Sequence, residues 1–311
     1  MPNRFVSVGV VLWLVVGSLL AACQPAASGR STSASFTVLA VETFLADIAQ
    51  NVAGDRAHVQ SLLPPDLDPH AFEPAPADVA KVAESQVLIV NGAGLEEWLA
   101  PLLENAGGQR LVVEAARGLT TRVPGASDPA AGEHPEGDPH FWLDPLQVVS
   151  YVANIRDGLS QADPAGKEVY AANAAAYTTR LMELDQWIRA QVDTVPAERR
   201  LLVTNHETLG YFADQYGFTV VGAIVPSVTS NAAPSAQEMA ALVDRVRAAG
   251  APAVFLESGV NPALAEQLAQ EAGLKVVTGL LTHSVSRAGG VAPTYLDMMR
   301  YNTTAIVTAL R

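Results

Sequence analysis

Two loops of this sequence share a short pattern that suits metal binding. The stretches "LDPHAFEP" (67–74) and "GDPHFWLDP" (137–145) each place a histidine directly after a proline, with aromatic residues and carboxylates close by. Proline restrains the backbone immediately before His70 and His140, and the aromatic side chains can enclose the imidazole. An imidazole fixed in this way is a preorganised metal ligand, and a flanking acid can hold its second ring nitrogen.

Two further histidines fall at the ends of apolar segments. His206 ends "RLLVTNH", and His283 follows "KVVTGLLT". Both segments are expected to be strands, and ligands bind beyond the carboxyl ends of strands in open α/β sheets. A lone histidine after a strand is more often a hydrogen-bonded structural residue, so no single one of these histidines indicates a metal site. Together, the four positions predict one shared metal site at His70, His140, His206 and His283.

The elements that would position these histidines alternate between strands and helices. Short apolar runs such as "FTVLAVE" and "VLIVNG" precede helical patterns, which predicts an α/β fold with parallel sheets covered by helices. Residues 163–195 contain no glycine beyond the first turn and no proline after Pro164, which predicts one unusually long helix. We expect this rigid helix to join two lobes, each a parallel sheet flanked by helices. The predicted N-terminal lobe covers residues 36–162 and the predicted C-terminal lobe covers residues 196–311.

The first residues have the plan of a secretory signal. Arg4 precedes an apolar run to Leu20 that is too short for a spanning helix, and "LAAC" resembles the bacterial lipoprotein box, in which the cysteine is lipidated. Residues 1–22 are therefore predicted to be a lipoprotein signal peptide and residues 23–35 a flexible tether. Cys23 is the only cysteine, so no intrachain disulfide can form. The predicted product is exported and tied to the membrane through a lipid on Cys23, in the periplasm or at the cell surface.

The charge balance excludes one class of partner. Without residues 1–22, which hold Arg4 and no acid, 18 Lys and Arg stand against 32 Asp and Glu, a net charge of −14. Such a surface repels the phosphates of nucleic acids and anionic lipid headgroups. We expect no nucleic-acid partner.

Four stretches resemble a single family. "DPHAFEPAPADVAKVAESQVLIVNGAGLEEWL", "DPHFWLDP", "NHETLGYFADQYGF" and "TYLDMMRYN" look like parts of the zinc/manganese solute-binding lipoproteins of bacterial ABC importers (cluster A-I). The resemblance runs over nearly the whole mature chain. It implies two α/β lobes joined by a long helix, one metal ion between them, an ABC permease as partner and no enzymatic reaction. A monomer is expected.

The resemblance also implies a ligand set. His70, His140 and His206 match the first three ligands of the family, and the third tends to be histidine in zinc members and glutamate in manganese members. His206 therefore indicates Zn²⁺ as the bound substrate, ahead of Mn²⁺. The fourth ligand is commonly an aspartate in a "TDS"-like stretch, whereas this chain reads "LLTHSVS" and places His283 there. Zinc members often carry a long His-rich loop before the second ligand, and this chain keeps only His134 in that region.

An all-histidine site raises a question of charge. Nitrogen ligands suit zinc better than manganese, which prefers oxygen, but four neutral imidazoles leave the double charge of the ion uncompensated. We therefore expect nearby carboxylates to hold the outer nitrogens of the ligands, with Asp144, Glu207 and Glu257 as candidates. In the alternative arrangement His283 turns to solvent, and Glu257 or a water completes the coordination.

These features favour an extracytoplasmic zinc-binding receptor that delivers Zn²⁺ to an ABC import permease. A receptor of the same type for manganese or another divalent metal is the first alternative. A metal-containing adhesin and a zinc hydrolase, with Glu207 or Glu257 as general base, are further alternatives. The hydrolase lacks any catalytic motif in the sequence.

The lipid on Cys23 can be tested directly. Mass spectrometry of the mature N-terminus should find a diacylglyceryl group on Cys23, because this residue follows "LLAA" and has no other cysteine to pair with. An unmodified thiol, or a mature N-terminus at another residue, would contradict the prediction.

Overall fold

The computed structural model describes residues 36–122, 137–225 and 234–311. The predicted signal peptide (1–22), the tether (23–35) with Cys23, and His134 lie outside these residues. Within the described part of the chain, no helix is long and apolar enough to cross a membrane.

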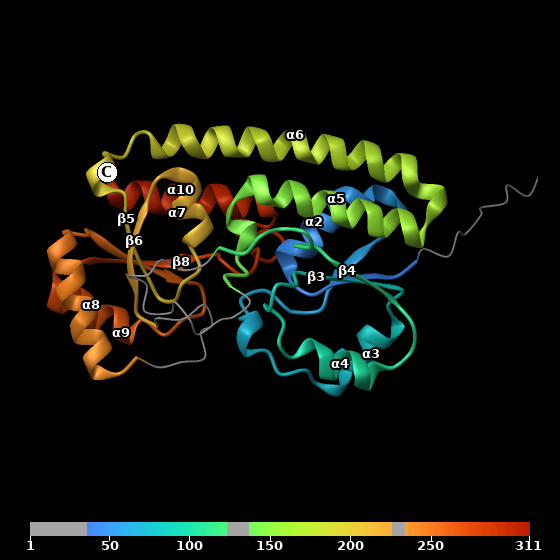
Figure 1. The fold of residues 1–311 in the computed structure, drawn as a ribbon, viewed down its shortest axis with the longest axis horizontal. Coiled ribbons are helices and arrows are strands. Elements are labelled where there is room, and N and C mark those ends of the chain that lie inside the picture. Colours follow the sequence, from blue (N-terminus) through green and yellow to red (C-terminus); the bar gives the residue numbers. More distant parts are fainter. Residues whose placement is uncertain (1–35, 123–136, 226–233) are drawn as a thin grey trace, which may run out of the picture. The chain divides into compact units, whose positions relative to one another are not determined.

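Two parallel four-stranded sheets form the framework (Figure 1). The first has the strand order β2-β1-β3-β4, and its strands are β1 (Val38–Ala40), β2 (Val59–Ser61), β3 (Val87–Val90) and β4 (Leu111–Glu114). The second has the order β6-β5-β7-β8, with β5 (Leu201–Thr204), β6 (Thr219–Ala223), β7 (Ala253–Glu257) and β8 (Lys275–Leu280). All ladders within these two sheets are parallel, as the alternation of strands and helices predicts.

Helices cover both faces of each sheet. They are α2 (Thr43–Ala53), α3 (Pro76–Glu84), α4 (Leu99–Ala106), α5 (Pro145–Ala162), α6 (Lys167–Val192), α7 (Gly210–Tyr216), α8 (Ala236–Ala249), α9 (Ala263–Ala272) and α10 (Tyr295–Leu310). Successive side chains of a strand point to opposite faces. In β1, Val38 and Ala40 belong to the core under α2 and α5, whereas Leu39 packs in a separate cluster with the residues of α3 and α4. The α/β fold predicted from the sequence is confirmed.

The long joining helix is α6. Its 26 residues extend over about 39 Å at 1.5 Å per residue. The predicted helix began at residue 163, but Pro164–Gly166 form a separate 3₁₀ turn. The Asp163 carboxylate accepts hydrogen bonds from Arg56 and Tyr170, which fixes this turn against the start of the helix.

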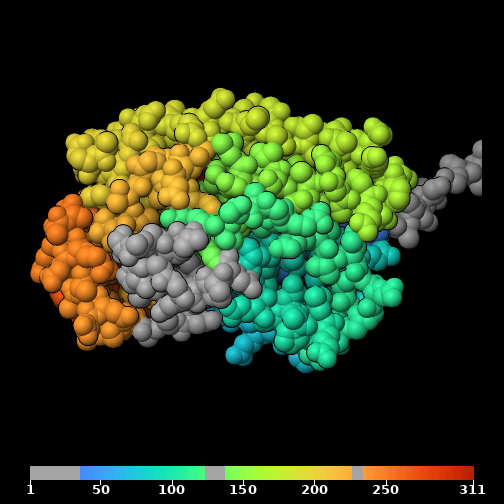
Figure 2. Space-filling view, viewed as in Figure 1, coloured from blue at the N-terminus to red at the C-terminus, as the bar shows by residue number. Residues whose placement is uncertain are grey.

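The main core is continuous under α6. One cluster of buried apolar residues includes members of both sheets and of helices α2, α5, α6, α7 and α10. Two smaller clusters lie under α3 and α4 and under α8 and α9. In the space-filling view the yellow-green side chains of α6 run along one side, next to segments from both halves of the chain (Figure 2). The two sheets therefore share one packed interior.

A buried polar network lies at the carboxyl ends of β1 and β3. Glu42 follows β1 and lies against Glu96, and both side chains are buried. Glu96 accepts hydrogen bonds from the backbone amides of Asn91 (2.6 Å) and Gly92 (3.0 Å). The Asn91 side chain donates to the carbonyl of Pro139 at 3.2 Å. The network thus connects the sheet edge to the loop that carries His140.

Both acids of this network hold their protons unusually strongly. Burial raises the pKa of Glu96 to about 7. Burial, and then the negative charge of Glu96, raise the pKa of Glu42 well above its ordinary value. Because the neutral forms suit this dry environment, folding favours protonation of the pair.

Glu42→Gln should make the protein less sensitive to rising pH. The stabilisation by the protonated pair is complete below the unfolded pKa of a glutamate, about 4.3. It is lost as the pH rises through the folded pKa values, which are about 7 for Glu96 and well above the ordinary value for Glu42. Between about pH 5 and pH 8, metal-free parent protein should lose stability relative to the variant by on the order of 1–3 kcal/mol. Urea unfolding across this range measures the difference, and exposed Glu104→Gln is the matched control. Parallel curves for the parent and Glu42→Gln would contradict the prediction.

Candidate metal centre

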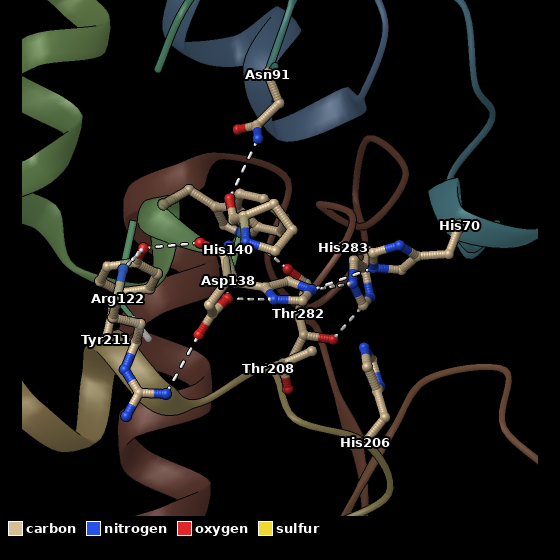
Figure 3. A network of polar contacts seen from close by, with 12 residues as sticks. His70, Asn91, Arg122, Asp138, His140, His206, Thr208, Tyr211, Thr282 and His283 are labelled. Atoms are coloured by element: carbon tan, nitrogen blue, oxygen red, sulfur yellow. Dashed lines mark hydrogen bonds and ion pairs between the residues drawn. The ribbon is translucent and has the colours of Figure 1, made fainter. Parts of the chain in front are cut away.

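The four histidines predicted from the sequence meet at one point. One ring nitrogen from each of His70, His140, His206 and His283 lies within 4.8 Å of the others (Figure 3). The Nε2 atom of His140 lies 3.2 Å from that of His70 and 3.3 Å from that of His283. In a tetrahedral site with metal–nitrogen bonds of about 2.0–2.1 Å, ligand nitrogens are separated by roughly 3.3–3.4 Å. The rings therefore have the spacing of groups that can share one ion.

The sheets explain why these rings converge. His70 follows β2, His206 follows β5 and His283 follows β8, each beyond the carboxyl end of its strand. His140 lies at the start of a 3₁₀ turn, Phe141–Leu143, that leads into α5. Parallel strands place their carboxyl ends at one edge of a sheet, and the two sheets direct those edges to the same place.

The repeated Asp-Pro-His pattern has a structural explanation. In each loop the aspartate two residues before the histidine accepts a hydrogen bond from the histidine's own backbone amide. The distances are 2.9 Å from His70 N to Asp68 and 3.0 Å from His140 N to Asp138. The intervening proline restricts the backbone in the same short turn. The pattern thus builds a stiff turn that ends in an imidazole.

Aromatic side chains complete the walls of both loops. Trp98 donates its indole N–H to the carbonyl of Pro69 at 2.8 Å and packs against Phe72. Trp142 donates to the carbonyl of Thr282 at 2.6 Å and stacks on Phe44. The second bond links the loop of His140 to the loop of His283.

A buried carboxylate fixes the ring of His140. The Nδ1 atom of His140 lies 2.8 Å from the Asp138 carboxylate, so Nδ1 carries the proton and Nε2 presents its lone pair to the centre. Burial and the neighbouring histidines lower the pKa of His140 well below its ordinary value, which keeps the ring neutral. Arg122 lies 3.5 Å from Asp138 and also binds Asp214 of α7 at 3.0 Å. The ring of His140 is thereby tied to a helix that belongs to the second sheet.

Glu257 holds two of the other rings. Its carboxylate lies 3.0 Å from Nδ1 of His206 and 3.2 Å from Nδ1 of His283, and it accepts a hydrogen bond from Thr208 at 3.1 Å. Burial would raise the Glu257 pKa, but the two histidines outweigh burial and lower that pKa well below its ordinary value. The carboxylate is therefore ionised. Its charge raises the pKa of His283 despite burial of that ring.

One buried ring nitrogen fits a metal ligand. Nε2 of His206 is buried and has no hydrogen-bond partner among the described residues. A buried polar atom without a partner is costly, and native structures rarely keep one without a reason. A metal ion at the centre of the four rings would supply that partner.

The predicted carboxylates have different roles. Glu257 contacts two of the four rings. The Asp144 carboxylate instead caps α5, because it accepts a hydrogen bond from the backbone amide of Leu146 at 2.9 Å. Glu207 is buried beside His206 in the chain. Asp138 was not among the predicted carboxylates, but it contacts His140, and its position in the repeated Asp-Pro-His pattern was the available signal.

Comparisons with known proteins agree with this geometry. Residues 38–309 match the family model described as "Zinc-uptake complex component A periplasmic". The manganese-binding lipoprotein MntA of Halalkalibacterium halodurans is 35% identical over 299 residues, which cover 96% of each chain. The manganese ABC transporter substrate-binding lipoprotein PsaA of Streptococcus pneumoniae is 30% identical over 96% of this chain and 97% of its own.

Solved structures show the same fold. The periplasmic zinc-binding protein TroA from Treponema pallidum superposes with a TM-score of 0.80 at 28% identity, covering 89% of this chain and 99% of its own. The Mn-bound periplasmic metal-binding protein from Candidatus Liberibacter asiaticus gives a TM-score of 0.78 at 27% identity, over 89% of this chain and 100% of its own. The chain therefore belongs to the family of extracytoplasmic solute-binding proteins that serve metal ABC importers, which are receptors and not enzymes.

Proposed function

We propose that this protein is a zinc receptor that binds one Zn²⁺ ion through the Nε2 atoms of its four central histidines and delivers it to an ABC permease. A lipid on Cys23 would keep the receptor at the membrane. The observation that carries the proposal is the convergence of four imidazoles, with the buried Nε2 of His206 lacking a partner among the described residues. The proposed ligands are His70, His140, His206 and His283.

The chemistry of the donors favours zinc. Imidazole nitrogen suits Zn²⁺, whereas Mn²⁺ prefers carboxylate, carbonyl and water oxygens. In the described structure the nearby carboxylates of Asp138 and Glu257 bind the outer nitrogens of the rings. Burial raises the pKa of Asp138 to about 7, whereas the pKa of Glu257 is lowered. The negative charge of Glu257 offsets part of the charge of the ion without occupying a coordination position.

Manganese is the second candidate. The relatives MntA and PsaA carry manganese in their names, and one similar solved structure is Mn-bound. In this chain the buried carboxylate of Glu257 already lies against two ligand rings, so it could exchange one of these ring contacts for a bond to the metal. Such an exchange would add the oxygen donor that manganese prefers.

Metal analysis separates the two candidates. Protein purified without added metal should contain zinc, and in competition the affinity for Zn²⁺ should exceed that for Mn²⁺ by roughly a hundredfold or more, following the usual order of nitrogen sites. Equal or tighter manganese binding would overturn the zinc assignment while leaving a metal receptor in place.

The role of His283 can be tested by substitution. His283→Ala should weaken zinc binding about tenfold or more, and His283→Asp should shift preference toward manganese because it introduces an oxygen donor. Isothermal titration with each metal measures both effects, and exposed His58→Ala is the control. Parent-like zinc affinity in His283→Ala together with a loss in Glu257→Ala would instead assign the fourth coordination position to Glu257.

A further inference from the structure

A cavity lies beside the four histidines. It has a volume of about 120 Å³, and residues from both halves of the chain line it. Its wall includes the polar residues Asp66, Asp68, Glu257, Ser258, His283 and Ser284. Because a water occupies about 30 Å³ in the liquid, the cavity has room for a few waters or a partly hydrated ion. His283 and Glu257 belong to the wall, so the cavity reaches the ligand cluster.

Two histidines of the cluster are enclosed. His140 and His206 are fully buried, and Trp142 and the Arg122–Asp138 pair cover the region around His140. His70 is the least buried of the four histidines, and its loop forms one side of the cavity through Asp68. The side of His70 and His283 therefore offers the shortest approach from solvent.

The wall of this cavity is negatively charged. It contains the carboxylates of Asp66, Asp68 and Glu257 and no lysine or arginine among the described residues. A narrow passage lined by one sign of charge concentrates ions of the opposite sign. This passage is suited to a cation.

Two hydrogen bonds cross the cavity at Asp66. The Ser258 hydroxyl donates to the Asp66 carboxylate at 3.0 Å, and the Asp66 backbone amide donates to the Ser284 hydroxyl at 3.1 Å. Asp66 precedes His70 in the same loop, Ser258 follows Glu257 and Ser284 follows His283. The bridge thus joins the loop of His70 to the loop of His283 and to the end of β7, where Glu257 lies.

The backbone around this bridge is specialised. Asp66 has a φ of 66°, a left-handed conformation that aspartate tolerates better than most residues. Gly259 has a φ of 82°, and a Cβ atom there would lie 3.3 Å from the Asp66 carbonyl oxygen. The loops approach so closely because a glycine lies opposite the strained residue.

We propose that this cavity is the route by which the metal ion reaches and leaves the four histidines, and that the Asp66 bridge to Ser258 and Ser284 is a latch that sets the rate of release. This inference rests on the proposed metal receptor function. Opening the two hydrogen bonds separates the loop of His70 from the loop of His283 without disturbing the shared core. Metal exchange then requires a local movement of loops.

Release of zinc from the full chain tests the latch. Zinc-loaded protein is mixed with excess chelator, and the release rate is read from tryptophan fluorescence, since the ring of Trp142 lies 5.2 Å from the ring of His140. Ser258→Ala removes one latch bond and should speed release roughly three- to tenfold, the factor expected for a single hydrogen bond. Association should also be faster, so the equilibrium affinity should change less than either rate.

Two variants serve as controls for Ser258→Ala. Ser258→Thr keeps the hydroxyl and should restore the parent release rate. Ser160→Ala removes a serine hydroxyl on α5, outside the cavity, and should leave the rate unchanged. A parent-like release rate in Ser258→Ala, or fast release in Ser258→Thr, would overturn the latch.

Asp66→Asn tests the route separately. Asparagine keeps an oxygen acceptor for Ser258 and tolerates the left-handed backbone, but it removes one negative charge from the passage. Zinc association should slow about two- to fivefold and depend less on ionic strength, with little change in release. An association rate and salt dependence equal to those of the parent would overturn the route. Failure of the metal receptor itself would appear differently, as no zinc uptake by the parent and no effect of His206→Ala.

Discussion

The structure depends on one electrostatic constraint: four converging imidazoles, three of them buried, must present lone pairs and not protons to a common point. A neutral imidazole carries one proton, and that proton must be on Nδ1 if Nε2 is to face the centre. Asp138 accepts the Nδ1 proton of His140, and Glu257 accepts those of His206 and His283. The carboxylates therefore fix the rings, and the ionised Glu257 supplies negative charge where a divalent ion would bind.

These carboxylates are in turn fixed by the elements around them. Arg122 and Tyr211 hold Asp138 between the two sheets, and Thr208 holds Glu257 at the end of β7. Gly210 lies so close to the Arg122 guanidinium and to Asp138 that any Cβ atom would collide with them. The positions of the ligand rings thus depend on the contact between the two halves of the chain.

The sequence predicted the fold class and the four converging histidines because both depend on local patterns. Alternating strands and helices require parallel sheets, and residues after such strands meet at one edge. The partners of the rings were harder to assign. Two aspartates, Asp138 and Asp144, flank His140. Asp144 caps α5, because aspartate is a preferred N-cap residue and proline follows it at the first helical position. Asp138 is the aspartate that contacts the ring. The double contact of Glu257 joins residues 26 and 51 positions away, and the bridge at Asp66 joins residues 192 and 218 positions away, which no local pattern encodes.

The packing of α10 against α2 has a consequence for biosynthesis. Tyr295 N donates to Asp47 and Val285 N donates to Thr43, so residues near the end of the chain close the core formed by residues near its beginning. Contacts of such long sequence separation form late, since the intervening loop entropy must be overcome first. A nascent chain that lacks its last helix cannot complete this core. An exported protein gains from that delay, because a polypeptide still unfolded can be threaded through a secretion channel before its binding site exists.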